Sequence, residues 1–230
     1  MLGPFPLPAS AASPAPARPA PADPVRDGHL AVCRTAGGLS AIGRSGVTLA
    51  VWRRRLPAGL SRHCAQLAEK DWPSFQLATT PDEVAADLAA ALPSRWNAGP
   101  LFEDIVHLVS VYADIVGCPA IRLRLDSLSG DGCRFFHVDY VGLRLLCTYR
   151  GAGTQWLPDG AVTRSALGHG DNDAVLSDPR RIQSLRAGHV ALLKGESWPG
   201  NRGRGLVHRS PPADPAGSRR LLLCLDHDEH

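Results

Sequence analysis

The sequence lacks several features that mark particular classes of protein. Its 230 residues contain no run of about 18 apolar residues, so no membrane-spanning helix and no membrane partner are predicted. The formal net charge is only +3, which gives no basis for a nucleic-acid partner, because neutralising phosphates requires an excess of basic residues. No Walker A or Rossmann glycine pattern and no G-x-S-x-G motif is present. These absences argue against the common nucleotide-binding and serine-hydrolase classes.

Cysteine pairs are also missing. The six cysteines include no C-x-x-C motif, and a chain of this length builds a core without disulfides. We therefore expect reduced thiols in a cytoplasmic protein. Residues 1–28 are rich in proline and alanine, with no basic start and no uninterrupted apolar segment, which argues against a secretory signal. Such a composition predicts a disordered or polyproline-like tail outside the fold.

Helical patterns come first along the chain. Apolar residues at helical spacing predict helices over residues 57–70 and 101–116, the second ending at Gly117. A third helix is predicted to begin at Thr80, where Pro81 suits the first turn and Glu83 can close a capping box, and to end at Leu92.

Strand patterns follow the helices. Ile121, Leu123 and Leu125 alternate with polar residues, as in a half-buried strand. Further strands are predicted over residues 133–140, 143–149, 189–194, 206–209 and 220–226. The sequence thus predicts an α+β fold, in which a mainly helical part (29–118) packs on a C-terminal double-stranded β-helix of the jelly-roll or cupin-like kind (119–230) as one compact unit.

A candidate metal site lies in this second part. Side chains alternate along a strand, so His137 and Asp139 of the predicted strand 133–140 share one face. His208, which follows a glycine-rich segment, is the candidate third ligand. Two histidines and one carboxylate on one face of an iron ion leave three positions open, enough for a bidentate keto acid and dioxygen.

Two arginines are candidates for holding such a keto acid. Arg219 and Arg220 begin the last apolar strand, 11 and 12 residues after His208. The distal carboxylate of chelated 2-oxoglutarate needs a forked, charged partner. Successive side chains of a strand point to opposite faces, so only one of the two can serve, with a preference for Arg220.

Two competing metal sites remain open. A second H-x-D sequence, His169 to Asp171, lies in a stretch rich in glycine and polar residues that favours a surface loop. Cys147 would make a fourth, closing ligand of a structural zinc site. The acidic and histidine-rich end, residues 226–230, is interpreted as a solvated tail.

The region around these residues resembles known families. Residues 136–156 (FHVDYVGLRLLCTYRGAGTQW) resemble the core of the 2-oxoglutarate/Fe(II) oxygenases, especially the prolyl-hydroxylase-like branch. Residues 186–193 (RAGHVALL) are similar to that family's run before its distal histidine, although many members have an acidic residue where this chain has His189. Residues from about 120 to 226 also resemble an uncharacterised bacterial family of unknown function, family 1826, with TYRGxGT and LVHRSPP signatures.

The resemblance implies a function and a set of roles. His137, Asp139 and His208 would bind Fe(II), and Arg220 or Arg219 would hold 2-oxoglutarate, with Tyr149, Arg144 and Trp156 as candidates to line the pocket. The chain would be a dioxygenase that hydroxylates a small molecule or a protein side chain of unknown identity. Two alternatives stay open: a non-catalytic, cupin-like metal-binding module, for instance one that holds zinc in metal homeostasis, and an interaction domain in which the three residues lie far apart.

Overall fold

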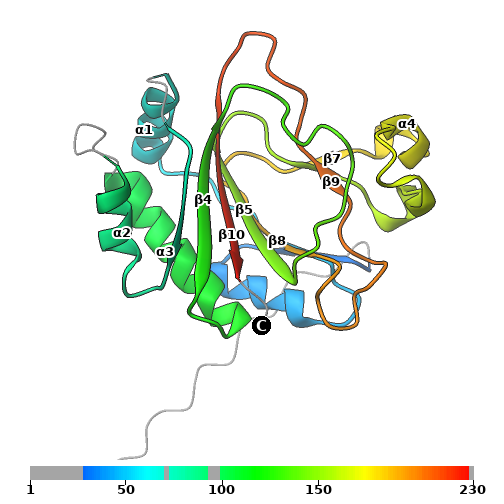
Figure 1. Ribbon diagram of the computed structural model, residues 1–230, viewed down its shortest axis with the longest axis horizontal. Helices are drawn as coiled ribbons and strands as arrows, with labels where there is room; N and C mark the ends of the chain where they lie inside the picture. Colours follow the sequence, from blue (N-terminus) through cyan, green and yellow to red (C-terminus); the bar gives the residue numbers. More distant parts are fainter. Residues whose placement is uncertain (1–27, 70–72, 93–98, 228–230) are drawn as a thin grey trace, which may run out of the picture.

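Two β-sheets form the frame of the molecule (Figure 1). The computed structural model describes residues 28–69, 73–92 and 99–227. The large sheet has the strand order β1 (Leu30–Cys33), β2 (Leu49–Trp52), β8 (Val190–Lys194), β5 (Leu143–Arg150), β10 (Arg220–His227), β4 (Ile121–Leu128) and β3 (Phe75–Thr79). All of its neighbouring strands are antiparallel except the parallel pair β1 and β2. The small sheet has the order β7 (Gln183–Ser184), β6 (Gln155–Trp156) and β9 (His208–Arg209).

Helices and the small sheet lie on opposite sides of the large sheet (Figure 1). The helical side is formed by α1 (Ala58–Glu69), α2 (Val84–Ala91), α3 (Gly99–Val116) and the 3-10 helix η1 (Ala36–Gly43). Beside the small sheet lie α4 (Asn172–Val175) and the 3-10 helices η3 (Asp159–Ala161), η4 (Arg164–Ala166) and η5 (Pro179–Arg181). No helix in the described ranges is long and apolar enough to cross a membrane.

Strand β10 is covered on both of its faces. Leu221, Leu223 and Leu225 belong to the core shared with the helices, whereas Leu222 and Cys224 belong to the core shared with the small sheet. Burial on both faces explains why this strand is a continuous apolar run instead of an alternating one. By contrast, β4 alternates, with Ile121 to Leu125 presenting every second residue to the helical side.

The predicted α+β class is confirmed, with some differences in detail. Helices α1 and α3 match their predicted ranges to within two residues, and Gly117 follows α3 with a φ of +69°. The N-terminal part was predicted to be mainly helical, yet β1, β2 and β3 all come from it and join the large sheet. These short strands lack the long alternation that makes β4 visible in the sequence. The predicted division into two parts stays a prediction, and residues 1–27 of the expected tail lie outside the described residues.

The start of α2 differs from the expected capping box. Residues 81–83 form a turn, and the helix begins at Val84. The Thr80 hydroxyl donates to the Glu83 carboxylate (2.9 Å), so neither side chain caps a backbone N–H in the expected way. The backbone N–H groups of Glu83 and Val84 are instead satisfied by the carbonyl of Thr80.

The predicted strand over residues 133–140 was wrong. The segment is irregular and contains a single β-bridge, between His137 and His208. Its other backbone groups bond to loops: the N–H of Phe136 donates to the Asn172 side chain, and the carbonyl of Asp139 accepts from the N–H of Glu196. Aromatic and β-branched composition suggested a strand here, but no neighbouring strand offers a ladder for these groups.

A buried ion pair joins the helices to the large sheet. Arg54 donates to both carboxylate oxygens of Asp104 on α3 (2.6 and 2.7 Å), and the Tyr149 hydroxyl of β5 donates to one of them (2.7 Å). Burial lowers the pKa of Arg54, but hydrogen bonding and charge from Asp104, with Cys147, outweigh it, so the pKa of Arg54 is raised and its guanidinium stays charged. The network ties α3, β5 and the segment after β2 together.

Removal of the Asp104 carboxylate should therefore destabilise the fold. Asp104→Ala leaves the Arg54 charge largely buried and unpaired, which should lower the free energy of unfolding by about 3–5 kcal/mol. Tyr149→Phe is the matched control, because it removes one neutral donor and should cost about 1 kcal/mol. Urea denaturation of both variants measures the difference. Equal losses in the two variants would contradict the importance of the ion pair.

Candidate metal centre

The structure brings His137, Asp139 and His208 together. Their ligand atoms all lie within 4.8 Å of one another. The His137 Nε2 atom is 3.7 Å from Asp139 Oδ1, and the His208 Nε2 atom is 3.3 Å from Asp139 Oδ2. The two imidazole rings are tilted against each other, with centroids 4.5 Å apart. The expectation of an accidental triad with distant histidines is contradicted by this geometry.

A backbone bridge sets the spacing of the two histidines. The N–H of His137 donates to the carbonyl of His208, and the N–H of His208 donates to the carbonyl of His137, each at 3.0 Å. Directly opposed residues of an antiparallel bridge present their side chains on the same side. The bridge thus places both rings beside each other although 71 residues separate them in sequence.

Hydrogen bonds orient both rings. The Nδ1 atom of His137 lies 2.9 Å from the carbonyl of Phe135, and the Nδ1 atom of His208 lies 3.0 Å from the carbonyl of Leu206. A carbonyl only accepts, so each Nδ1 carries the proton in this arrangement. In the neutral ring, Nε2 then offers a lone pair toward Asp139, the arrangement found in metal-binding histidines. Burial, followed by the neighbouring His208, lowers the pKa of His137, which favours this neutral form.

The Asp139 carboxylate is charged and incompletely satisfied. Its Oδ1 forms an ion pair with Nη1 of Arg144 at 2.7 Å. Its Oδ2 is buried without a hydrogen-bond partner, and the nearby His208 Nε2 atom (3.3 Å) carries no proton to donate when the proton is on Nδ1. Burial raises the pKa of Asp139, but His208, Arg144 and His137 together hold it well below its usual value. A buried, ionised oxygen without a donor needs a cation, so two nitrogens and this oxygen fit a divalent metal ion.

Arg144 holds the Asp139 carboxylate in place. It donates to both oxygens of Asp226 (2.7 and 2.8 Å) and forms an ion pair with Asp139, and so bridges the two acids. Asp226 was expected in a solvated tail, but its register on β10 buries it at 6% exposure. The sequence offered no sign of this pairing, because 82 residues separate Arg144 from Asp226.

A cavity of about 270 Å³ opens beside the two histidines. It lies over β4, β5 and β10, on the side of the large sheet that faces the small sheet. Its polar lining is contributed by Arg124, Asp126, Arg144, Thr154, Arg209 and Ser210. Leu128, Leu146 and Leu222 supply an apolar part. The volume accommodates a small dicarboxylate next to the candidate metal.

Arg220 and Arg219 point to opposite sides of the large sheet and bond to different residues. Arg219 donates to the hydroxyl and carbonyl oxygens of Ser127, away from the cavity. Arg220 is buried at 5% exposure and donates to the carbonyl of Ala152 (2.8 Å) and to the hydroxyl of Ser210 (3.4 Å), which lines the cavity. Its Nη2 atom is buried without a hydrogen-bond partner. These contacts favour Arg220 over Arg219, and the choice of a cosubstrate ligand stays a prediction.

Gly151 makes room for the Arg220 side chain. A Cβ atom at position 151 would lie 2.7 Å from Cγ and 3.3 Å from Cα of Arg220, and the residue has a φ of +87°. Both the space and the backbone conformation require glycine here. The sequence showed a glycine-rich turn, but not that it serves the arginine.

Two other expectations for β5 are corrected. Tyr149 and Cys147 belong to the core on the helical side, where Tyr149 bonds to Asp104 and Cys147 lies 3.6 Å from Arg54. Neither faces the cavity, so Tyr149 is not a cosubstrate ligand and Cys147 does not close a zinc site. Their position follows from strand alternation, since Arg144 and Leu146 of the same strand line the cavity.

The rival H-x-D sequence has a structural role. Asp171 caps α4 by accepting from the N–H groups of Asp173 and Ala174. Among the described residues, His137, Asp139 and His208 are the one cluster of three metal-binding side chains. Trp156 also lies elsewhere: it pairs with His208 across the small sheet but lines a different cavity.

Glu196 was missed in the sequence. Its carboxylate accepts from the N–H groups of Gly203 and Gly205, and its own N–H donates to the carbonyl of Asp139. It therefore braces the glycine-rich loop before His208 against the segment that carries Asp139. The sequence shows only that Glu196 is a charged residue near glycines, which does not predict its contacts with Gly203, Gly205 and Asp139.

A family model for a protein of unknown function, DUF1826, matches residues 34–226. The chain belongs to the DUF1826 family. The two signatures noted in the sequence lie at the site of this family member: TYRGxGT runs from β5 to Thr154, and LVHRSPP contains His208 and Ser210. No curated protein matches the chain.

Solved structures with a similar fold include three oxygenases. A dioxygenase for auxin oxidation from rice is 16% identical, with 83% of this chain and 78% of that chain covered and a TM-score of 0.48. A Pseudomonas putida prolyl-4-hydroxylase is 12% identical, with 85% and 94% covered and a TM-score of 0.43. A dioxygenase for auxin oxidation from Arabidopsis thaliana, in complex with 2-oxoglutarate, is 11% identical, with 75% and 73% covered and a TM-score of 0.37. At these identities the likeness concerns the fold alone.

Metal binding should depend on the three converging side chains. His208→Ala and Asp139→Ala each remove one ligand and should weaken the binding of Fe(II) or Zn(II) by at least about 100-fold, because structural metal affinity rests on a complete ligand set. His169→Ala, in the rival H-x-D sequence, is the matched control and should bind normally. Anaerobic calorimetric titration measures the affinities. Normal metal binding by both ligand variants would place the metal elsewhere.

Proposed function

We propose that the chain is an Fe(II)/2-oxoglutarate-dependent oxygenase, a hydroxylase built on a double-stranded β-helix. The observation that carries the proposal is the buried Arg220, whose Nη2 atom lacks a hydrogen-bond partner. Its Nη1 atom donates to Ser210, which lines the same cavity as the candidate ligands His137 and His208. A buried guanidinium nitrogen without an acceptor is costly, and the distal carboxylate of 2-oxoglutarate supplies one. Burial lowers the pKa of Arg220, and the charge of Asp126 offsets this only in part.

The chain's own residues would each have a defined task. His137, Asp139 and His208 would hold the iron, and Arg144 would keep the Asp139 carboxylate ionised and turned toward it. Bound Fe(II) with 2-oxoglutarate supplies the chemistry that couples decarboxylation of the keto acid to oxidation of a substrate by dioxygen. Arg220 and Ser210 would orient the keto acid in the cavity, and the apolar wall with Leu222 would exclude water.

The substrate would approach over His137. Its side chain is 34% exposed, whereas that of His208 is 7% exposed, so the site opens on the His137 side. Phe135 and Tyr140, which flank the ligands, are the exposed large hydrophobic residues of the described chain. Such aromatic contacts suit an apolar small molecule or a protein side chain.

A metal-binding module without catalysis is the alternative. Zinc accepts the same three ligands, and a fourth protein ligand would favour a closed structural site. With Cys147 on the opposite face of β5, no fourth described side chain completes such a cluster. This difference supports the oxygenase over the structural zinc site.

The cosubstrate site is tested by a matched pair of arginine variants. Anaerobic addition of 2-oxoglutarate to the Fe(II) protein should produce the visible metal-to-keto-acid absorption. Arg220→Gln should weaken 2-oxoglutarate binding on the order of 100-fold, because a charge-assisted contact in a buried site is lost. Arg219→Gln is the control and should leave the band unchanged, since Arg219 bonds to Ser127 instead.

Gly151→Ala gives a second test of the same pocket. The added methyl group would press on the Arg220 side chain and should weaken 2-oxoglutarate binding while iron still binds. If iron binds to the parent protein but 2-oxoglutarate produces no band, the oxygenase proposal fails and the metal-binding module takes its place.

A further inference from the structure

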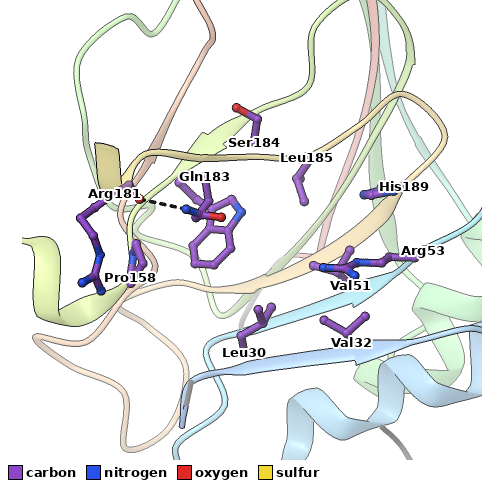
Figure 2. Close-up of a pocket in the computed structure, with 11 residues that line it drawn as sticks. Leu30, Val32, Val51, Arg53, Pro158, Arg181, Gln183, Ser184, Leu185 and His189 are labelled. Carbon is purple, nitrogen blue, oxygen red and sulfur yellow. Dashed lines mark hydrogen bonds between the residues drawn. The ribbon is translucent and has the colours of Figure 1, made fainter. Parts of the chain in front are cut away.

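A second cavity lies at the opposite edge of the two sheets (Figure 2). Its volume is about 310 Å³. It lies between β1 and β2, at one edge of the large sheet, and β6 and β7 of the small sheet. It shares no lining residue with the cavity beside the metal ligands, which lies over β4, β5 and β10. The proposed oxygenase chemistry makes no use of it.

The floor of this cavity is apolar and firmly packed. Val51, Trp156 and Leu185 are almost fully buried and belong to the core between the sheets. Leu30 and Val32 of the edge strand β1 are half-buried and continue this surface outward. Trp156 and Gln183 are direct partners across β6 and β7, and both line the cavity. A flat aromatic ring with an amide nearby suits a flat ligand body.

The rim of the cavity carries positive charge. Arg53, Arg181 and His189 line it, and no aspartate or glutamate does. Neither arginine makes a side-chain hydrogen bond or ion pair within the described part of the chain. Figure 2 shows Arg181 beside Pro158 at one end and Arg53 near His189 at the other. The cavity thus combines an apolar floor with cations at both ends.

The groups around His189 also indicate that this end of the cavity is positively charged. Burial lowers the pKa of His189, and the positive charges of Arg53 and Arg186 lower it further. Arg53 and His189 both line this end of the cavity, and no carboxylate is among the groups that shift the pKa of His189. The positive charge of Arg53 there would attract an anionic ligand and would disfavour a cationic one.

We propose that this cavity binds a small organic anion with an aromatic or apolar body. The body would lie on Trp156, Val51 and Val32, and its carboxylate, sulfonate or phosphate group would bond to Arg53 or Arg181. Forked guanidinium groups recognise such anions with paired hydrogen bonds. The volume limits the ligand to a small molecule, and binding would not require the metal.

The test uses the full-length, metal-free protein and the fluorescent probe 8-anilinonaphthalene-1-sulfonate, an aromatic sulfonate. The parent should bind one high-affinity equivalent of the probe, with enhanced fluorescence that weakens as salt is added. The double variant Arg53→Gln/Arg181→Gln should weaken this binding by about fivefold or more, since both charged contacts are lost. Val32→Trp should also abolish it, because the larger side chain would fill the cavity without a change in charge.

Matched controls separate this site from the general charge and from the metal centre. Arg55→Gln/Arg202→Gln removes the same net charge from exposed arginines that do not line the cavity, and should leave probe affinity unchanged. His208→Ala should likewise bind the probe normally, although it loses a candidate metal ligand. Equal affinity in the parent and the Arg53/Arg181 double variant, or an equal loss in the Arg55/Arg202 control, would overturn the proposal.

Discussion

The pair of backbone hydrogen bonds between His137 and His208 is the contact on which the candidate site depends. It joins an irregular segment after β4 to the short strand β9, and neither of these has a long ladder of its own. Because directly opposed residues present their side chains together, one bridge creates the two-histidine half of the site. Glu196 reinforces it by binding the glycine-rich loop on one side and the Asp139 segment on the other. The ligand geometry is therefore built from loops held at a few points.

Alternation along the strands of the large sheet directs some side chains to the cavity and others to the helical core. On β5, Arg144 and Leu146 face the cavity, whereas Cys147 and Tyr149 face the helices. On β10, Arg220 and Asp226 share the polar side, while Leu223 packs against the helices. The helical faces of β5 and β10 thus belong to one hydrophobic core, whereas their other faces carry buried charges beside a second apolar cluster. That arrangement lets ionised groups lie deep in the fold without disrupting the core that stabilises it.

Most charged groups near the candidate metal ligands are paired. Arg144 forms ion pairs with Asp139 and Asp226, and Arg124 forms one with Asp126. Three buried atoms of this region lack a hydrogen-bond partner: Asp139 Oδ2, Arg220 Nη2 and Arg124 Nε. The Asp139 oxygen lacks a cation or a donor, and the Arg220 nitrogen lacks an acceptor. Buried polar groups are normally paired, so these two atoms of opposite charge would be satisfied by a metal ion and a carboxylate.

Local side-chain patterns were enough to predict the strongest elements and to identify the three candidate ligands. Helices α1 and α3 and the alternating β4 follow from periodicity, and β10 follows from its continuous apolar run, all of which depend only on the local sequence. Tertiary structure decided what periodicity does not encode. The short strands β1 to β3 form because neighbouring strands supply their hydrogen bonds. Tyr149 does not face the candidate site, because the register of β5 directs its side chain toward Asp104. Packing also decides which face of each strand lies inward, and this is a long-range property. It directs Arg220 toward the cavity and Arg219 away from it, and it brings Arg144 to Asp226.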